Sequence, residues 1–183
     1  MKHSWKLLSK KIVFNHPHKK LVLWQMRTHQ GKRHPFVMIE GRDVVIVFPF
    51  TTDGRVVVII QYYVAVQRAV WTLPTGILDK GSTPAATARG ELRQEAGCSA
   101  GRLISLGTAL KGKYSTGVIR YFLALDVQPG AAQELEDAED IAVKFFSLPQ
   151  FERLLARGAL EEAWVAVGAY RALSCLKKLG LSR

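Results

Sequence analysis

The stretch Gly76-Ile-Leu-Asp-Lys-Gly-Ser-Thr-Pro-Ala-Ala-Thr-Ala-Arg-Gly-Glu-Leu-Arg-Gln-Glu-Ala-Gly-Cys98 carries the strongest local signals in this sequence. Its Ser-Thr-Pro segment at 82–84 can cap a helix and occupy its first turn, and Gly97 can end that helix. The pattern therefore predicts a helix over 84–96. The segment before it, at 71–81, contains two glycines and a proline, which predict a loop.

The charged side chains of this helix follow an unfavourable pattern. Glu91 and Glu95 share one stripe of the helix, with Gln94 nearby, and two arginines share another stripe. Like charges at this spacing repel, and the helix dipole disfavours anions in the last turns. A cation between the glutamates would relieve both penalties, and Mg²⁺ or Mn²⁺ suits carboxylate and amide oxygens. The alternative is a solvated helix face that binds nothing.

Apolar residues at helical spacing predict which faces pack into the core. On the first helix these are Ala85, Ala88, Leu92 and Ala96. On the last helix they are Leu160, Trp164, Val167, Tyr170, Leu173 and Leu176. The second stripe is interpreted as a core face first and as a dimer face second.

The rest of the chain alternates between strand-like and helical patterns. Strands are expected at 6–14, 20–28, 36–40, 44–50, 56–63, 103–110, 118–127 and 141–146, and helices at 150–157 and 160–179. Strands followed by one helix, more strands and then helices indicate a mixed α/β layer fold. We expect an N-terminal antiparallel strand subdomain at 1–43 and a larger α/β domain at 44–183.

Composition restricts the class of protein. The chain has 183 residues, of which 48% are hydrophobic and 22% charged, as in globular domains. No apolar run approaches the roughly 20 residues that a bilayer requires, so no membrane span is expected. Two cysteines and the absence of a secretory signal pattern favour the reducing cytoplasm. The net charge of +11 favours anionic partners, but without a recognition motif nucleic acid is not the expected one.

Together with the preceding loop, the quoted stretch resembles the signature box of the Nudix hydrolases. The matching residues are Gly76, Glu91, Leu92, Glu95 and Gly97, with Cys98 replacing a final aliphatic residue. Leu73-Pro74-Thr75-Gly76 and the upstream run Val58-Ile-Ile-Gln-Tyr62 are similar to the ADP-ribose and ADP-sugar pyrophosphatase branch. The resemblance implies an α/β/α sandwich with a mixed sheet, in addition to the small N-terminal strand subdomain.

Three positions depart from the box. The family has Glu at the position of Ser82, Arg at Gly90 and Glu at Gln94. The amide of Gln94 offers only a neutral oxygen, so the affinity for a cation should be lower. Loss of the Glu and the Arg together is interpreted as a paired change, because removing both leaves no unpaired charge.

The resemblance also implies an activity and the residues that carry it. Nudix enzymes hydrolyse a nucleoside diphosphate linked to another moiety, here of ADP-ribose or ADP-sugar type, with a divalent cation. The implied metal ligands are Glu91, Glu95, Gln94 and the main-chain carbonyl of Thr75, with Glu136 and Glu139 as general-base candidates. The alternative is a catalytically impaired Nudix-fold protein that binds a nucleotide or a macromolecular partner.

Further residues are candidates for contacts with the nucleotide. Basic residues that could meet phosphate oxygens are Lys80, Lys113 and Arg120. Trp24 and Tyr63 could stack on a base, although a tryptophan in an apolar strand usually belongs to the core. The family resemblance also implies a homodimer that forms through the N-terminal strands.

Overall fold

The structure is a computed structural model that describes residues 4–17 and 19–181. The chain divides into two compact units, one formed by Met1–Asp43 with Ala109–Val118 and the other by Val44–Thr108 with Ile119–Arg183. The boundaries expected from the sequence, 1–43 and 44–183, stay a prediction.

The first unit contains a three-stranded antiparallel sheet in the order β1-β2-β3. The strands are β1 (Lys6–Asn15), β2 (Lys20–Arg27) and β3 (Arg33–Glu40). Val22 is the one hydrophobic residue of these strands that is fully buried, whereas Ile12, Val13 and Phe14 are exposed. Taken by itself, this small sheet therefore leaves much of its apolar surface uncovered.

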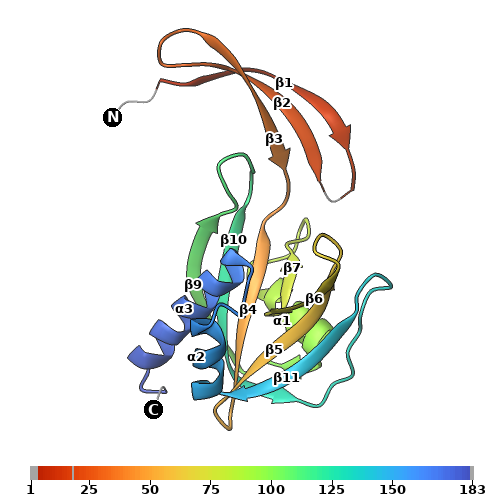
Figure 1. Ribbon diagram of the computed structural model, residues 1–183, viewed down its shortest axis with the longest axis vertical. Helices are drawn as coiled ribbons and strands as arrows, with labels where there is room; N and C mark the ends of the chain where they lie inside the picture. The colour runs from red at the N-terminus through yellow and green to blue at the C-terminus, as the bar shows by residue number, and fades with distance from the viewer. Residues whose placement is uncertain (1–3, 18, 182–183) are drawn as a thin grey trace. The chain divides into compact units, whose positions relative to one another are not determined.

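The second unit is built around a mixed sheet (Figure 1). Its main path follows the order β11-β5-β4-β10-β8, with β6 beside β5, β7 beside β4 and β9 beside β10. The strands are β4 (Val44–Thr51), β5 (Arg55–Tyr63), β6 (Arg68–Thr72), β7 (Thr75–Ile77), β8 (Cys98–Ser99), β9 (Arg102–Leu110), β10 (Val118–Pro129) and β11 (Ile141–Ser147). The sheet is mixed because β4 and β10 run parallel while β5 is antiparallel to β4.

Helices cover both faces of this sheet (Figure 1). They are α1 (Pro84–Ala96), α2 (Leu148–Ala156) and α3 (Ala163–Lys178). The alternation of side chains along β4 assigns the layers: Val47 packs in one core cluster with Leu92 of α1. Phe48, on the opposite face, meets Phe151 of α2 with ring centroids 5.2 Å apart. The α/β/α sandwich predicted from the sequence is therefore confirmed.

Two expectations about local structure were wrong at 71–81 and at Ala85. The segment predicted to be a loop contains the end of β6 and all of β7, which pairs with β4 in the register Ile46↔Thr75. Strand pairing outweighs the local preference of Pro74, which lies between the two strands and interrupts neither. Ala85 is exposed, although the rest of its predicted apolar face is buried.

The core face of α3 is also rotated from the predicted stripe. Val167 and Tyr170 are exposed, whereas Leu176 is buried as predicted. The helix also buries four residues outside the predicted stripe: Val165, Gly168, Ala169 and Ala172. A Cβ on Gly168 would come within 2.9 Å of the Tyr121 ring, so the helix approaches the sheet through its small residues. Large apolar side chains indicated the wrong face because close approach of helix and sheet selected the small ones.

Candidate functional site

Helix α1 has the limits that the sequence predicts. At its start, the side-chain oxygen of Thr83 accepts a hydrogen bond from the amide of Ala86 at 3.2 Å. At its end, Gly97 adopts a φ of +60°, and its amide donates to the carbonyl of Arg93. Because Leu92 is fully buried against the sheet, the rotation of the helix is fixed, and with it the position of both glutamates.

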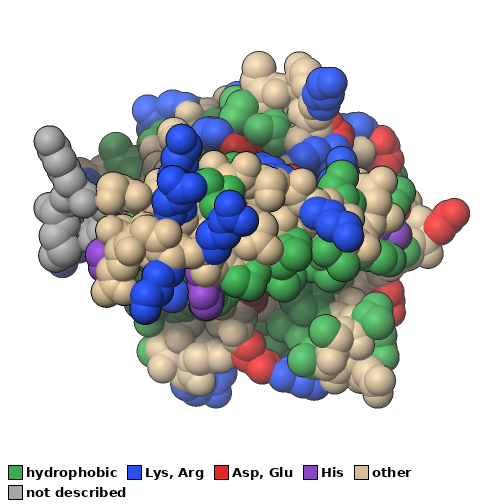
Figure 2. Space-filling view, turned by 90° about the horizontal axis from the view of Figure 1, so that it is seen from above, with side chains coloured by type: hydrophobic (Ala, Val, Ile, Leu, Met, Phe, Trp, Pro, Cys, Tyr) green, Lys and Arg blue, Asp and Glu red, His purple; other side chains and the backbone are tan. Residues whose placement is uncertain are grey.

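The acidic residues of the helix and of the later acidic run line one cavity of about 120 Å³. The lining residues are Asp79, Glu91, Gln94, Glu95, Glu134, Glu136 and Glu139. None of them is a lysine or an arginine. The surface elsewhere is basic, as the net charge of +11 requires, and Figure 2 shows many Lys and Arg side chains on the face that it displays. The cavity therefore concentrates negative charge in a basic protein.

Glu95 is the most deeply buried of these acids, with 2% of its surface exposed. Its Oε2 accepts a hydrogen bond from the amide of Thr75 at 2.7 Å. Burial raises the pKa of Glu95 to about 9, the Thr75 bond partly opposes that rise, and the charges of Glu91 and Glu139 add to it. The carboxylate is thus held in place while its negative charge is poorly compensated.

Glu91 lies against the backbone of Gly76. A Cβ at Gly76 would overlap the Glu91 carboxyl group, so only glycine leaves room for this side chain. Burial raises the pKa of Glu91 to about 7, with further contributions from Glu139, Glu136 and Asp79. No hydrogen bond or ion pair joins Glu91 or Glu95 to a lysine or arginine within 4–17 and 19–181.

The acidic run is anchored to the end of α1 by main-chain contacts. The amide of Glu134 donates to the carbonyl of Gln94 at 2.9 Å, and the side-chain amide of Gln133 donates to the carbonyl of Glu95 at 2.6 Å. These bonds hold the run beside the helix, so that Glu136 and Glu139 reach the cavity. The sequence run 134–140 thereby becomes a wall of the site.

The structure places the three departures from the box in different surroundings. Gln94 lines the cavity, where its family counterpart would add a carboxylate. A Cβ built on Gly90 would make an ordinary van der Waals contact with Oε1 of Gln94 at 3.8 Å. The hydroxyl of Ser82 contacts that of Thr87 at 3.1 Å. Ser82 and Gly90 therefore do not touch, and the paired-change hypothesis gains no support from a contact.

The remaining predicted site residues are distributed over both units. Lys80 is exposed in the loop before α1, and Arg120 lies half-buried on β10. Tyr63 donates its hydroxyl to Glu162 at 2.7 Å, and burial raises the pKa of Tyr63. This bond occupies the hydroxyl in a contact with the segment before α3.

Two of the predicted residues belong to the first unit. Trp24 donates from its ring nitrogen to Glu40 at 2.9 Å, and Lys10 lies over its ring. Lys113 lies over the ring of Tyr114, with its ammonium 5.3 Å from the centroid. Their partners in the structure are therefore residues of their own unit.

Two cavity residues were not predicted from the sequence. Asp79 and Glu134 line the cavity, and both are acids of the box loop and the acidic run. Thr75 donates its amide to Glu95, and the role of its carbonyl as a metal ligand stays a prediction. Within the described residues, no three His, Cys, Asp or Glu side chains converge closely enough to hold a metal ion by themselves.

Comparisons with known proteins agree with this fold. The model of the NUDIX domain family matches residues 40–166. The ADP-ribose pyrophosphatase of Mycobacterium tuberculosis is 27% identical over 136 residues, which is 72% of this chain and 65% of the mycobacterial protein. The ADP-ribose pyrophosphatase of Bacillus subtilis is 23% identical over 163 residues, which is 88% of each chain.

A solved structure gives a similar picture. The crystal structure of an ADP compounds hydrolase matches with a TM-score of 0.85 and 20% identity, over 97% of this chain and 96% of that one. At this identity the likeness establishes the fold. Among the described residues, no helix is long and apolar enough to cross a membrane.

Proposed function

We propose, because the chain belongs to the Nudix family, that its acidic cavity hydrolyses the diphosphate of an ADP-ribose-like substrate with the aid of Mg²⁺ or Mn²⁺. The observation that carries the proposal is the pair of buried Glu95 and half-buried Glu91, which face one cavity without a lysine or arginine partner among the described residues. Two curated relatives named ADP-ribose pyrophosphatase support the substrate class.

The donor set of the cavity fits a divalent cation. Hard oxygen ligands come from Glu91, Glu95 and Gln94. Burial, and then the neighbouring carboxylates, raise the pKa values of both glutamates, and a cation bound between them would favour their charged forms. Bound there, the cation would neutralise charge on the diphosphate oxygens and on the leaving group. The chain itself keeps Glu95 in place through the Thr75 amide and leaves room for Glu91 at Gly76.

The acidic run supplies the candidate general base. Glu139 is half-buried and lines the cavity, and its Oε2 accepts a hydrogen bond from the amide of Glu136 at 2.9 Å. One of its carboxylate oxygens is thereby oriented, so the other can accept the proton of a water that attacks phosphorus. Glu136 is the second candidate because it lines the same cavity.

Contacts with the rest of the substrate are proposed for five residues. Lys80, Lys113 and Arg120 would meet phosphate oxygens. Trp24 and Tyr63 would stack on a base.

We also propose that the chain works as a homodimer in the cytoplasm. The exposed apolar residues of the N-terminal sheet, Ile12, Val13 and Phe14 among them, support a partner chain at that sheet. Two free cysteines, Cys98 and Cys175, support a reducing compartment.

A second function is favoured by one observation, the amide at Gln94. It lines the cavity where the family has a carboxylate, which lowers the negative charge available to a cation. The second candidate is therefore a Nudix-fold protein with impaired catalysis that still binds a nucleotide or a macromolecular partner.

The test is turnover of ADP-ribose with Mg²⁺ and, separately, Mn²⁺, with AMP release measured by chromatography. Glu95→Gln should lower turnover by roughly a hundredfold or more, because it removes a carboxylate that would hold the cation at the diphosphate. Asp137→Asn is the matched control: it changes an acid of the same run that does not line the cavity, and turnover should persist.

Each outcome separates the two functions. Turnover by the wild type that is lost in Glu95→Gln supports the hydrolase. Activity that appears only in Gln94→Glu supports the impaired protein. If neither chain releases AMP and neither binds ADP-ribose, the hydrolase is wrong, and so is the nucleotide-binding form of the second candidate.

A further inference from the structure

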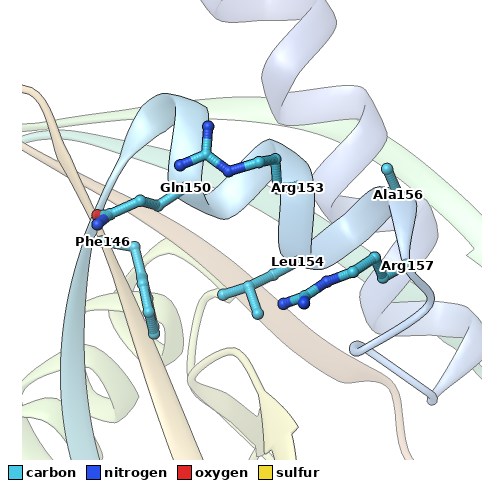
Figure 3. Close-up of a pocket in the computed structure, with 6 residues that line it drawn as sticks. All are labelled: Phe146, Gln150, Arg153, Leu154, Ala156 and Arg157. Atoms are coloured by element: carbon cyan, nitrogen blue, oxygen red, sulfur yellow. The ribbon is translucent and has the colours of Figure 1, made fainter.

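A second cavity lies on the other face of the sheet, where β11 meets α2 (Figure 3). Its volume is about 460 Å³, within the range of pockets that hold small molecules. The lining residues are Phe146, Gln150, Arg153, Leu154, Ala156 and Arg157. It shares no lining residue with the acidic cavity.

The polar groups of this cavity are hydrogen-bond donors. Arg153 and Arg157 contribute two guanidinium groups, and within the described part of the chain neither forms a side-chain hydrogen bond or ion pair. Gln150 has its carbonyl oxygen occupied by the amide of Ser147 at 2.9 Å and by the Ser147 hydroxyl at 3.0 Å. Its side-chain nitrogen therefore remains as a donor.

Arg153 lies on α2 and Arg157 is the C-cap residue four positions later, so both side chains border the same end of the helix. Like charges at this spacing repel each other, and no acidic side chain lines the cavity to offset them. A doubly charged anion would accept hydrogen bonds from both guanidinium groups and remove the repulsion.

The remaining walls are apolar. Phe146 and Leu154 line the cavity, and Figure 3 shows the Arg157 side chain extending beside Leu154. Trp71 meets the Phe146 ring at 62° with centroids 5.4 Å apart, which holds that ring in position. An aromatic ring against the floor of the cavity would thus find an apolar contact next to the cationic groups.

From this geometry we infer that the β11–α2 cavity is a second ligand site that binds a nucleoside monophosphate. Its phosphate is held by Arg153 and Arg157, and its base rests against Phe146 and Leu154. The site is separate from the hydrolytic cavity and does not depend on a divalent cation.

The inference is tested with AMP as the probe, by calorimetric titration of the whole chain in excess EDTA. Arg153→Gln/Arg157→Gln should weaken AMP binding by about tenfold or more, because each guanidinium contributes a charge-assisted contact. The matched control is Arg33→Gln/Arg102→Gln, which removes two exposed arginines elsewhere on the chain and should leave the affinity unchanged. Thermal unfolding of each variant checks that it is folded.

Two further measurements distinguish the contribution of the phosphate charge to AMP binding from that of the contact between the base and Phe146. Phe146→Leu should weaken AMP several-fold and leave inorganic phosphate unaffected, and adenosine should bind far more weakly than AMP. Glu95→Gln should bind AMP as the wild type does, so failure of the hydrolase proposal and failure of this one are distinguishable.

Three results would overturn the inference. One is the absence of saturable AMP binding below about 1 mM. The second is equal affinity in the wild type and in Arg153→Gln/Arg157→Gln. The third is an AMP-to-phosphate affinity ratio that Phe146→Leu does not change, which would exclude contact with the base.

Discussion

The two cavities of the α/β/α unit have opposite charge and opposite construction. The acidic cavity measures about 120 Å³ and is lined by carboxylates from α1 and from the run that is bonded to its end. The cavity beside α2 measures about 460 Å³ and is lined by two arginines over apolar walls. Within the described residues, neither Glu91 and Glu95 in the first cavity nor Arg153 and Arg157 in the second form an ion pair, whereas Glu134, which also lines the acidic cavity, pairs with Arg93.

The difference lies in how each set of charges is held. Glu95 is buried by the packing of α1 and fixed by the Thr75 amide, so its position is set by the core. Arg153 and Arg157 are exposed and can reorient. The acidic cavity therefore behaves as a preorganised site with a cost in stability, whereas the α2 cavity becomes ordered only around its ligand.

The largest expected effect separates two glycines of the box. Gly76→Ala should lower divalent-cation-dependent turnover by roughly a hundredfold, because the new Cβ displaces the Glu91 carboxyl group. Gly90→Ala is the control: its Cβ makes only an ordinary contact, at 3.8 Å from Oε1 of Gln94, and alanine in a helix interior should stabilise the fold by roughly 0.5–1 kcal/mol. Steady-state kinetics and thermal unfolding test both, and equal activity in Gly76→Ala would contradict the geometry.

The second effect is on the pH dependence of stability in EDTA. The pKa values of Glu91 and Glu95 are raised on folding to about 7 and about 9 from 4.5, so the folded chain binds extra protons in that window. The contribution of Glu91 and Glu95 to the free energy of unfolding is therefore fully present below about pH 4.5, and it is lost as the pH rises through 7 and 9. The melting temperature should fall by roughly 5 °C across this window.

This pH dependence should disappear where the acidic cavity is neutralised. Glu95→Gln should flatten the fall between pH 7 and 9, the upper part of the window set by the pKa values near 7 and 9. Asp137→Asn should not change it. Mg²⁺ should reduce the fall in the wild type, and a melting temperature that rises over this range would contradict the assignment.

A third effect concerns the affinity for the cation. Gln94→Glu adds a carboxylate to the cavity wall and should tighten Mn²⁺ binding by about tenfold, as measured by calorimetry. Asp126→Asn, on an exposed residue outside the cavity, should leave the affinity unchanged. Weaker binding by Gln94→Glu would mean that this side chain does not face the ion.

The smallest expected effect is on the free energy of unfolding when the two arginines of the α2 cavity are replaced in the absence of ligand. Arg153→Gln/Arg157→Gln should change the free energy of unfolding by only about 0.5 kcal/mol, because an exposed like-charged pair costs little. Chemical denaturation measures it. A destabilisation above about 2 kcal/mol would mean that the arginines support the fold, and the two cavities would then not differ as described.

Local sequence patterns predicted most of the helices and strands correctly. The predictions failed where contacts between distant segments determine the structure. The cap at Thr83 and the left-handed Gly97 fix α1, because both depend on neighbouring residues only. Strand β7 was missed because its stability comes from pairing with β4, far away in the chain. The buried face of α3 was misassigned because the close approach of Gly168 to Tyr121 selects small residues.

The sequence by itself determined the helix of the box, the spacing of Glu91 and Glu95 and the resemblance to the family, since these depend on neighbours in the chain. Only the tertiary structure decided that the run 134–140 faces these glutamates, and that Arg153 and Arg157 border a cavity with Phe146. The physical reason is that burial and electrostatic environment arise from contacts between distant segments, which no local pattern encodes.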